Sequence, residues 1–104
     1  MSFLVVLTTT PDKKSARKIA DILIQKKLAA CVSLGPGWQS VYRWKGRTGK
    51  TREVLLLIKT SRARLKTLQK TLIQNHPYDV PEVLVLPASA PHSAYAAWLR
   101  DSLK

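Results

Sequence analysis

The sequence predicts an α+β fold, a ferredoxin-like βαββαβ sandwich with a long β-hairpin and a C-terminal helix. β-prone runs and amphipathic helical runs alternate in the order strand, helix, strand, strand, helix, strand. The two middle strands flank a glycine-containing turn, which is typical of a hairpin. The chain has 104 residues, the usual size of one domain, so residues 1–104 are expected to fold as a single unit.

The first strand and the first helix have the clearest pattern. Phe3 to Leu7 is a continuous apolar run, as expected of a strand buried on both faces. Thr10 is expected to cap the helix that follows, with Pro11 at its first position. One apolar stripe then recurs at helical spacing: Ala16, Ile19, Ala20, Leu23 and Ile24.

The middle of the chain predicts the hairpin. Its first strand begins at Leu28–Val32, bends or bulges at 35–37, and continues with Trp38, Ser40, Tyr42 and Trp44 on one face. Residues 46–49 supply the turn, and residues 52–59 return. Such a long apolar hairpin exceeds what one small layer needs, so another copy of the chain is expected to cover it.

The last third predicts a second helix, a fourth strand and a terminal helix. Thr60-Ser61 is expected to cap the second helix, and Pro77 prevents it from continuing past about Asn75. Val83 to Leu86 is expected to be the fourth strand, closed by Pro87. The terminal helix opens after residues 89–92 and is expected to dock on the sheet as a unit through Tyr95, Trp98 and Leu99.

Charge is the unusual property of the composition. Eighteen Lys and Arg residues against six Asp and Glu give a formal net charge of +12. This balance permits attraction to nucleic acid or anionic lipid. The cations fall on the two predicted helices and around the hairpin turn, without any known nucleic-acid-binding motif. The interpretation at this point is a solvated basic surface, with nucleic acid not expected as a partner.

The sequence also predicts a location. No apolar run approaches the ~18 residues of a membrane-spanning helix, and the N-terminus has no signal-peptide pattern, so no membrane partner is expected. The single cysteine, Cys31, cannot form an internal disulfide and is expected to be a buried small hydrophobe. These features predict a cytoplasmic protein.

The loop from His76 to Glu82 is the strongest candidate for a site. It places an imidazole, a phenol, two carboxylates and two prolines just before a buried strand. A weak transition-metal site at His76, with Asp79 or Glu82, is one interpretation, and a stiff helix-to-strand connection is the other. No nucleophile–base pair is visible, so no enzyme is predicted.

Lys59 offers a different site. It ends an apolar strand directly before a helix N-terminus, where the backbone amides of Thr60 and Ser61 are placed to hold an anion. The alternative is a solvated lysine at a strand end.

Seven motifs together resemble one family. They run in order from about Val5 to Leu99: Thr9-x-Pro11-Asp12, Leu28-Ala29-Ala30-Cys31-Val32, Ser40-x-Tyr42-x-Trp44-x-Gly46, Glu53-Val54-Leu55 with Ile58-Lys59-Thr60, His76-Pro77-Tyr78-x-Val80-Pro81-Glu82, Leu86-Pro87, and Tyr95-x-x-Trp98-Leu99. With these motifs the chain resembles the CutA family of divalent-cation tolerance proteins. The resemblance implies a cytoplasmic homotrimer of ferredoxin-like subunits, related in architecture to PII signalling proteins. It also implies tolerance of copper and other divalent cations, and no catalytic reaction.

The chain departs from that family at two places. Copper ligation proposed in the family uses a cysteine and two adjacent histidines, and the corresponding residues here are Thr8, Asn75 and His76. The hairpin turn, often acidic in the family, is basic here, and like charges gathered in a trimer should disfavour cation binding at that tip.

Two functions follow from the residues and the resemblance. The first is a non-enzymatic homotrimer that responds to metal ions such as copper and binds a divalent cation weakly through His76 and Glu82. The alternative is a PII-like trimeric sensor that binds a small anionic metabolite, with Lys59 and Tyr78 as binding residues, or that binds a partner protein.

Overall fold

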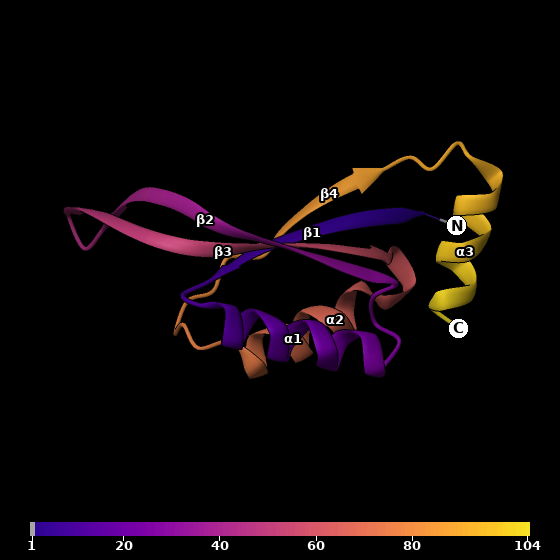
Figure 1. Cartoon of the computed structure of the whole chain (residues 1–104), viewed down its shortest axis with the longest axis horizontal. Helices are drawn as coiled ribbons and strands as arrows, with labels where there is room; N and C mark the ends of the chain where they lie inside the picture. The colour runs from indigo at the N-terminus through magenta and orange to yellow at the C-terminus, as the bar shows by residue number, and fades with distance from the viewer. Residues whose placement is uncertain (1) are drawn as a thin grey trace.

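The computed structural model describes residues 2–104 and confirms the predicted α+β fold. A four-stranded sheet in the order β2-β3-β1-β4 has only antiparallel neighbours. Along the chain, as Figure 1 shows, the elements are β1 (Phe3–Thr10), α1 (Lys13–Gln25), β2 (Cys31–Trp44), β3 (Arg47–Ser61), α2 (Arg62–Asn75), β4 (Leu84–Ala88) and α3 (Ser93–Ser102).

The molecule has two layers. Figure 1 shows α1 and α2 side by side beneath one face of the sheet, while the opposite face carries no helix and the β2–β3 hairpin extends past the helix layer. The core lies between the layers, where Leu23, Leu56 and Leu72 are fully buried. Because strand residues alternate between faces, Leu55 and Leu57, the neighbours of Leu56 in β3, point to the uncovered side.

α1 begins later than predicted. Thr10 remains in β1, paired with Val54, and its Oγ1 donates to the carbonyl oxygen of Asp12 at 2.9 Å. Asp12 is the N-cap, since its Oδ1 accepts from the backbone N–H of Ser15 at 2.7 Å. These hydrogen bonds lower the pKa of the Asp12 carboxyl. The prediction of Thr10 as the cap was wrong because sheet pairing keeps Thr10 as the last residue of β1.

The hairpin has the predicted bulge but a tighter turn. The register of β2 against β3 shifts between Gly35 and Trp38, as expected. The turn is not residues 46–49: Lys45 and Gly46 alone form it, with φ of 50° and 77°, typical of a two-residue type I′ turn. Thr48 and Gly49 belong to β3. A Cβ on Gly49 would lie 2.6 Å from the ring of Tyr42, so a larger residue at this position would have to displace that ring.

The remaining boundaries differ in detail. α2 ends at Asn75 as predicted, and Ser61 is its N-cap residue without a side-chain hydrogen bond. β2 starts at Cys31 instead of Leu28. β4 spans Leu84–Ala88 and therefore contains Pro87, which was expected to close it; an edge strand tolerates proline because one side needs no ladder hydrogen bond.

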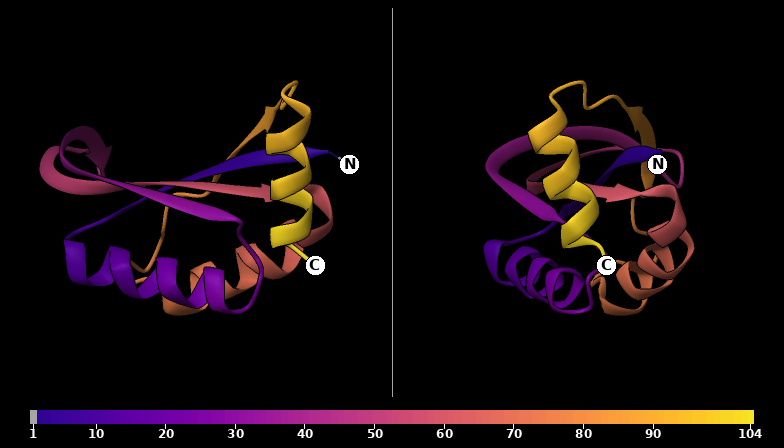
Figure 2. Two further views of the ribbon diagram at one scale, coloured as in Figure 1. Left: turned by 45° about the vertical axis from the view of Figure 1, so that its right-hand side comes forward. Right: turned by 90° about the vertical axis from the view of Figure 1, so that its right-hand side faces the viewer.

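α3 lies at the end of the molecule opposite the hairpin tip, beside the N-terminal end of β1 (Figure 2). There Ala96 and Leu99 pack against Phe3 in a small second core. The expectation that three side chains of α3 dock together was wrong: Tyr95 and Trp98 stay 43% and 46% exposed and stack on each other instead. Within residues 2–104, no helix is long and apolar enough to cross a membrane.

Candidate functional site

His76 fixes the start of the candidate loop. It follows α2 directly, is only 9% exposed, and lies against the end of β1. Its Nδ1 accepts the backbone N–H of Tyr78 at 3.1 Å, so the ring proton sits on Nε2, which donates to the carbonyl oxygen of Thr9 at 2.8 Å. The hydroxyl of Thr8 lies 3.2 Å from the same nitrogen. Both ring nitrogens are thus engaged within the chain.

Burial keeps this imidazole neutral. Removal from water lowers the pKa of His76, an effect larger than the opposing hydrogen bond to Thr9 and the charge of Glu53. His76 therefore acts as an anchor that ties the loop to β1. For it to bind a metal, one of its two backbone hydrogen bonds would have to break.

Tyr78 connects the loop to β3. Its hydroxyl donates to Oε2 of Glu53 at 2.7 Å, and its ring is tilted against that of His76 with centroids 5.1 Å apart. Burial, and then the bond to Glu53, raise the pKa of Tyr78 well above its ordinary value, so the hydroxyl keeps its proton. Glu53 itself is 8% exposed.

A second carboxylate shares this region. Partial burial, followed by the negative charge of Glu53, raises the pKa of Glu82. Two carboxylates, one from β3 and one from the end of the loop, are thus close enough to repel each other. A cation between them would relieve that repulsion.

Glu53 was missed as a site residue in the sequence. The signal was present, since it is a carboxylate that opens the apolar run 54–58 of β3. The partner that gives Glu53 its role, Tyr78, lies 25 positions along the chain, and only the fold brings the two together.

A groove of about 580 Å³ runs along the uncovered face of the sheet beside Glu82. Its walls are mostly apolar and include Val5, Leu7, Leu57 and Leu86, with Thr9 and Glu82 adding polar groups. Apolar walls of this kind favour contact with another protein surface or an apolar ligand over open water.

Lys59 lies at the other end of the sheet. Its Nζ donates to Oγ of Ser33 at 2.6 Å and lies 3.7 Å from Sγ of Cys31. The hydroxyl of Thr60 is used elsewhere, since it donates to the carbonyl oxygen of Leu28. Because Lys59 and Glu53 are six residues apart on β3, about 20 Å separates Lys59 from the region of Tyr78. The two residues predicted to bind an anion are therefore not in one place.

The acidic and sulfur-containing residues do not gather into a ready metal centre. Residues 2–104 contain no group of three or more His, Cys, Asp or Glu side chains arranged to hold a metal ion. Cys31 is partly buried, not fully buried as expected, because its strand lies on the edge of the sheet beside Lys59. Among the described residues near the loop, Glu53 bonds Tyr78 and both ring nitrogens of His76 bond the backbone, so Glu82 is, of the two carboxylates, the one without such a bond.

Comparison with known proteins bears on this arrangement. The model of the CutA1 divalent ion tolerance protein family matches residues 4–102. The divalent-cation tolerance protein CutA of Pectobacterium atrosepticum is 45% identical over 100 residues, which are 96% of this chain and 91% of that protein. The chloroplastic protein CutA of Arabidopsis thaliana is 42% identical over 97% of this chain, which spans only 56% of that longer relative.

Solved structures agree with the sequence matches. The divalent cation tolerance protein Cut A1 of Thermus thermophilus superposes with a TM-score of 0.94 at 40% identity, covering 98% of this chain and 99% of that one. CutA1 of Oryza sativa superposes with a TM-score of 0.96 at 40% identity, covering 100% and 95%. The chain therefore belongs to the CutA1 divalent ion tolerance family.

Proposed function

We propose that this protein acts in divalent-cation tolerance as a cytoplasmic, non-enzymatic homotrimer that binds a divalent cation weakly at Glu53 and Glu82. The observation that carries the proposal is the Glu53 carboxylate, held by the Tyr78 hydroxyl, whose negative charge adds to burial in raising the pKa of Glu82 at the end of the same loop. The relatives named for divalent-cation tolerance support the cellular role. The absence of a nucleophile–base pair from the sequence supports a binding role over catalysis.

The donor set accounts for weak binding. Glu82 is partly exposed and offers both oxygens, whereas one oxygen of Glu53 already accepts from Tyr78. Oxygen donors suit hard cations such as Mn²⁺. At any given site of this kind, however, Cu²⁺ binds with higher affinity than Mn²⁺. Since two carboxylates leave most coordination positions to water, the cation is expected to exchange readily.

The uncovered face supports the trimer. Leu84 and Leu86 of β4 are 54% and 49% exposed, and the groove beside them is open. A second copy placed there would bury these side chains and bring further groups close to Glu82. A three-fold assembly of this kind would have a mass three times the 11.7 kDa of one chain.

Titration calorimetry with Cu²⁺ and with Mn²⁺ tests the cation site. Glu82→Gln is expected to weaken binding about tenfold or more, because it removes one of the two charges that attract the metal. Asp21→Asn is the matched control, since Asp21 is an exposed carboxylate on α1 paired with Arg17. The site is wrong if Glu82→Gln binds as tightly as the wild type.

His76→Ala separates anchoring from ligation. If His76 only anchors the loop, this change should lower the affinities for Cu²⁺ and Mn²⁺ to a similar degree. If its nitrogen binds the metal, the affinity for Cu²⁺ should fall far more, since imidazole favours copper over manganese.

Lys59 favours a second candidate, a sensor of small anionic metabolites. Its ammonium group donates to Ser33 and Cys31 and forms no ion pair within the described chain. Thermal unfolding in the presence of ATP or inorganic phosphate tests this function. A rise in melting temperature that disappears in Lys59→Met would support it, and the absence of any rise would contradict it.

A further inference from the structure

We infer that one face of the β2–β3 hairpin is a binding surface for single-stranded nucleic acid, held through its phosphates. Residues 43–52 contain five cations and no acidic residue: Arg43, Lys45, Arg47, Lys50 and Arg52. All five are exposed. This inference does not depend on the proposed cation site, whose carboxylates it does not use.

The register of the hairpin sorts its side chains onto two faces. Trp38, Tyr42 and Trp44 share one face, because each is separated from the next by an even number of residues. The other face carries Arg43 and, across the ladder, Lys50 paired with Val41 and Arg52 paired with Gln39. Arg47, paired with Trp44, lies on the aromatic face, and Lys45 is in the turn. Three of the five cations, Arg43, Lys50 and Arg52, therefore share the face opposite the aromatic side chains, the basic face.

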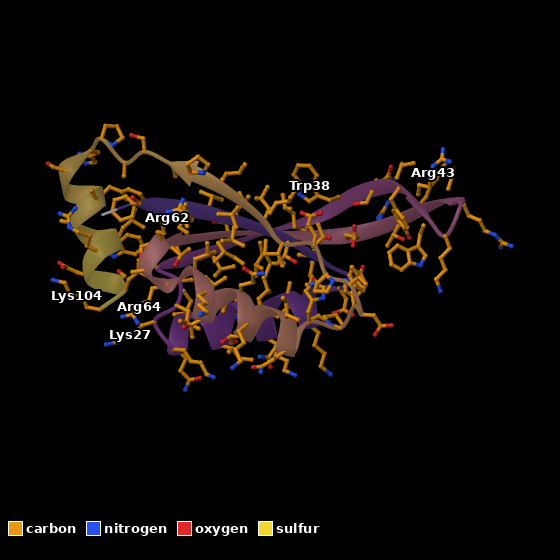
Figure 3. The ribbon with its side chains drawn as sticks, turned by 180° about the vertical axis from the view of Figure 1, so that it is seen from behind. Lys27, Trp38, Arg43, Arg62, Arg64 and Lys104 are labelled. Atoms are coloured by element: carbon orange, nitrogen blue, oxygen red, sulfur yellow. The ribbon has the colours of Figure 1, made fainter. Side chains whose placement is uncertain are left out.

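Among residues 2–104, Arg43, Lys50 and Arg52 form no ion pair. The two ion pairs among residues 2–104 join Arg17 to Asp21 and Lys104 to Asp101, both far from the hairpin. Uncompensated like charges repel each other and are relieved by a polyanion. Arg43 projects from the hairpin near its tip in Figure 3, at the opposite end of the molecule from Arg62 and Lys104.

The basic face ends at a cleft of mixed charge in the body of the protein. A cleft of about 390 Å³ lies where the base of the hairpin meets the start of α1, and both Arg52 and Lys13 line it. Two carboxylates, those of Asp12 and Glu53, also line this cleft, and a hydrogen bond from a neutral donor does not cancel the charge of a carboxylate. The uninterrupted positive surface is therefore that of Arg43, Lys50 and Arg52 on the hairpin itself.

The shape of this surface favours a flexible strand. The hairpin is a twisted two-stranded ribbon that stands out from the helix layer (Figure 1), so its basic face turns along its length. A flat anionic membrane can meet only part of such a surface. Along β3, Lys50 and Arg52 are two residues apart, about 7 Å. A single strand of nucleic acid can follow the twist and place successive phosphates near successive cations.

The ribbon is also held in shape before any partner arrives. The ring of Tyr42 lies against Gly49, and its hydroxyl lies 2.8 Å from Oγ1 of Thr51, within hydrogen-bond distance. Both contacts join β2 to β3 near the tip. The spacing of the cations is therefore set by the fold, which lowers the entropy lost on binding.

Fluorescence anisotropy with a labelled oligouridine tests the inference. Wild-type protein is expected to bind with an affinity that falls steeply between about 50 and 200 mM salt. The triple variant Arg43→Gln, Lys50→Gln, Arg52→Gln should lose at least about tenfold in affinity. Its slope of log affinity against log salt should fall by about 2, since each phosphate contact on a single strand contributes about 0.7.

The matched control removes the same charge elsewhere. Arg62→Gln, Lys66→Gln, Lys70→Gln takes three exposed cations from α2 and should bind oligouridine nearly as the wild type does. Unchanged secondary structure by circular dichroism shows that each variant is folded. If both triple variants lost the same affinity for oligouridine, the effect would depend on net charge alone, and the inference would be overturned. Binding to phosphatidylserine vesicles but not to oligouridine would also overturn it, as would equal affinity for a DNA duplex.

Discussion

The two faces of the sheet differ in what covers them, although the same strands supply both. On the helix side, Val6, Leu56 and Ile58 are fully buried. On the other side, Leu84 and Leu86 keep about half of their surface exposed. The covered face is complete within one chain, whereas the uncovered face has apolar groups that only another surface can bury. Fold stability should thus depend on the first face and assembly on the second.

The largest expected effect on stability comes from a substitution in the covered face. Leu56→Ala should lower the free energy of unfolding by about 2–5 kcal/mol, because it leaves a cavity between sheet and helices. Denaturant unfolding at several protein concentrations measures this. The loss should be the same at each concentration, and a loss that vanishes on dilution would show that the covered face also depends on assembly.

Leu86→Asp should break the uncovered face without unfolding the chain. A carboxylate in the apolar groove opposes docking of a second copy, so the mass by light scattering should fall to that of one 11.7 kDa chain while the circular dichroism spectrum is kept. Ile24→Asp is the control, since Ile24 is 43% exposed on the helix side. It should leave the mass unchanged. Equal dissociation by both variants would contradict the distinction between the faces.

His76 should make stability depend on pH at the edge of the covered face. Its pKa is lower in the folded protein than the ordinary 6.5, so the unfolded chain binds more protons in the window between the two values. Stability is therefore complete above about pH 6.5 and falls as pH decreases through this window, by at most about 1.4 kcal/mol per pH unit. Denaturant unfolding against pH measures it: His76→Gln should remove this dependence, and exposed His92→Gln should retain it.

The smallest expected effect on stability comes from a substitution of Glu82, at the edge of the uncovered face. The pKa of Glu82 is raised in the folded protein, so its ionised form opposes folding, and this penalty appears as pH rises above about 4.5. Glu82→Gln should stabilise the metal-free protein at neutral pH by a few tenths of a kcal/mol, since solvent screens a partly exposed charge. Thermal unfolding measures it, with Asp79→Asn as control. A loss of stability in Glu82→Gln would mean that the carboxylate has a favourable partner.

Local patterns were enough to predict most of the fold. Helical and strand periodicity located α1, α2 and the hairpin, and Pro77 correctly ended α2. The errors occurred where pairing between distant segments decides a boundary: sheet pairing holds Thr10 in β1, and the edge position of β4 accepts Pro87.

The candidate site was only partly predictable for the same reason. Its loop was visible because two prolines and a histidine stand close together in sequence. The groups that give the loop its chemistry lie far away along the chain, since His76 bonds Thr9 across 67 positions. That bond decides which ring nitrogen carries the proton, and the pairing of Tyr78 with Glu53 decides where negative charge accumulates.

Lys59 has a consequence for how copies of this chain can fit together. Its ammonium group, with Ser33 and Cys31, forms a small polar area on the uncovered side of the sheet, apart from the apolar walls of the groove. Any copy that covers this area must bring an acceptor atom or a water channel to it, because an unpaired buried ammonium is strongly disfavoured. Ser33 and Cys31 accept from the ammonium group within the chain, so an alignment that brings neither an acceptor nor water would leave its remaining proton unpaired. Lys59 would therefore disfavour such alignments of a second copy, which apolar contact alone does not distinguish.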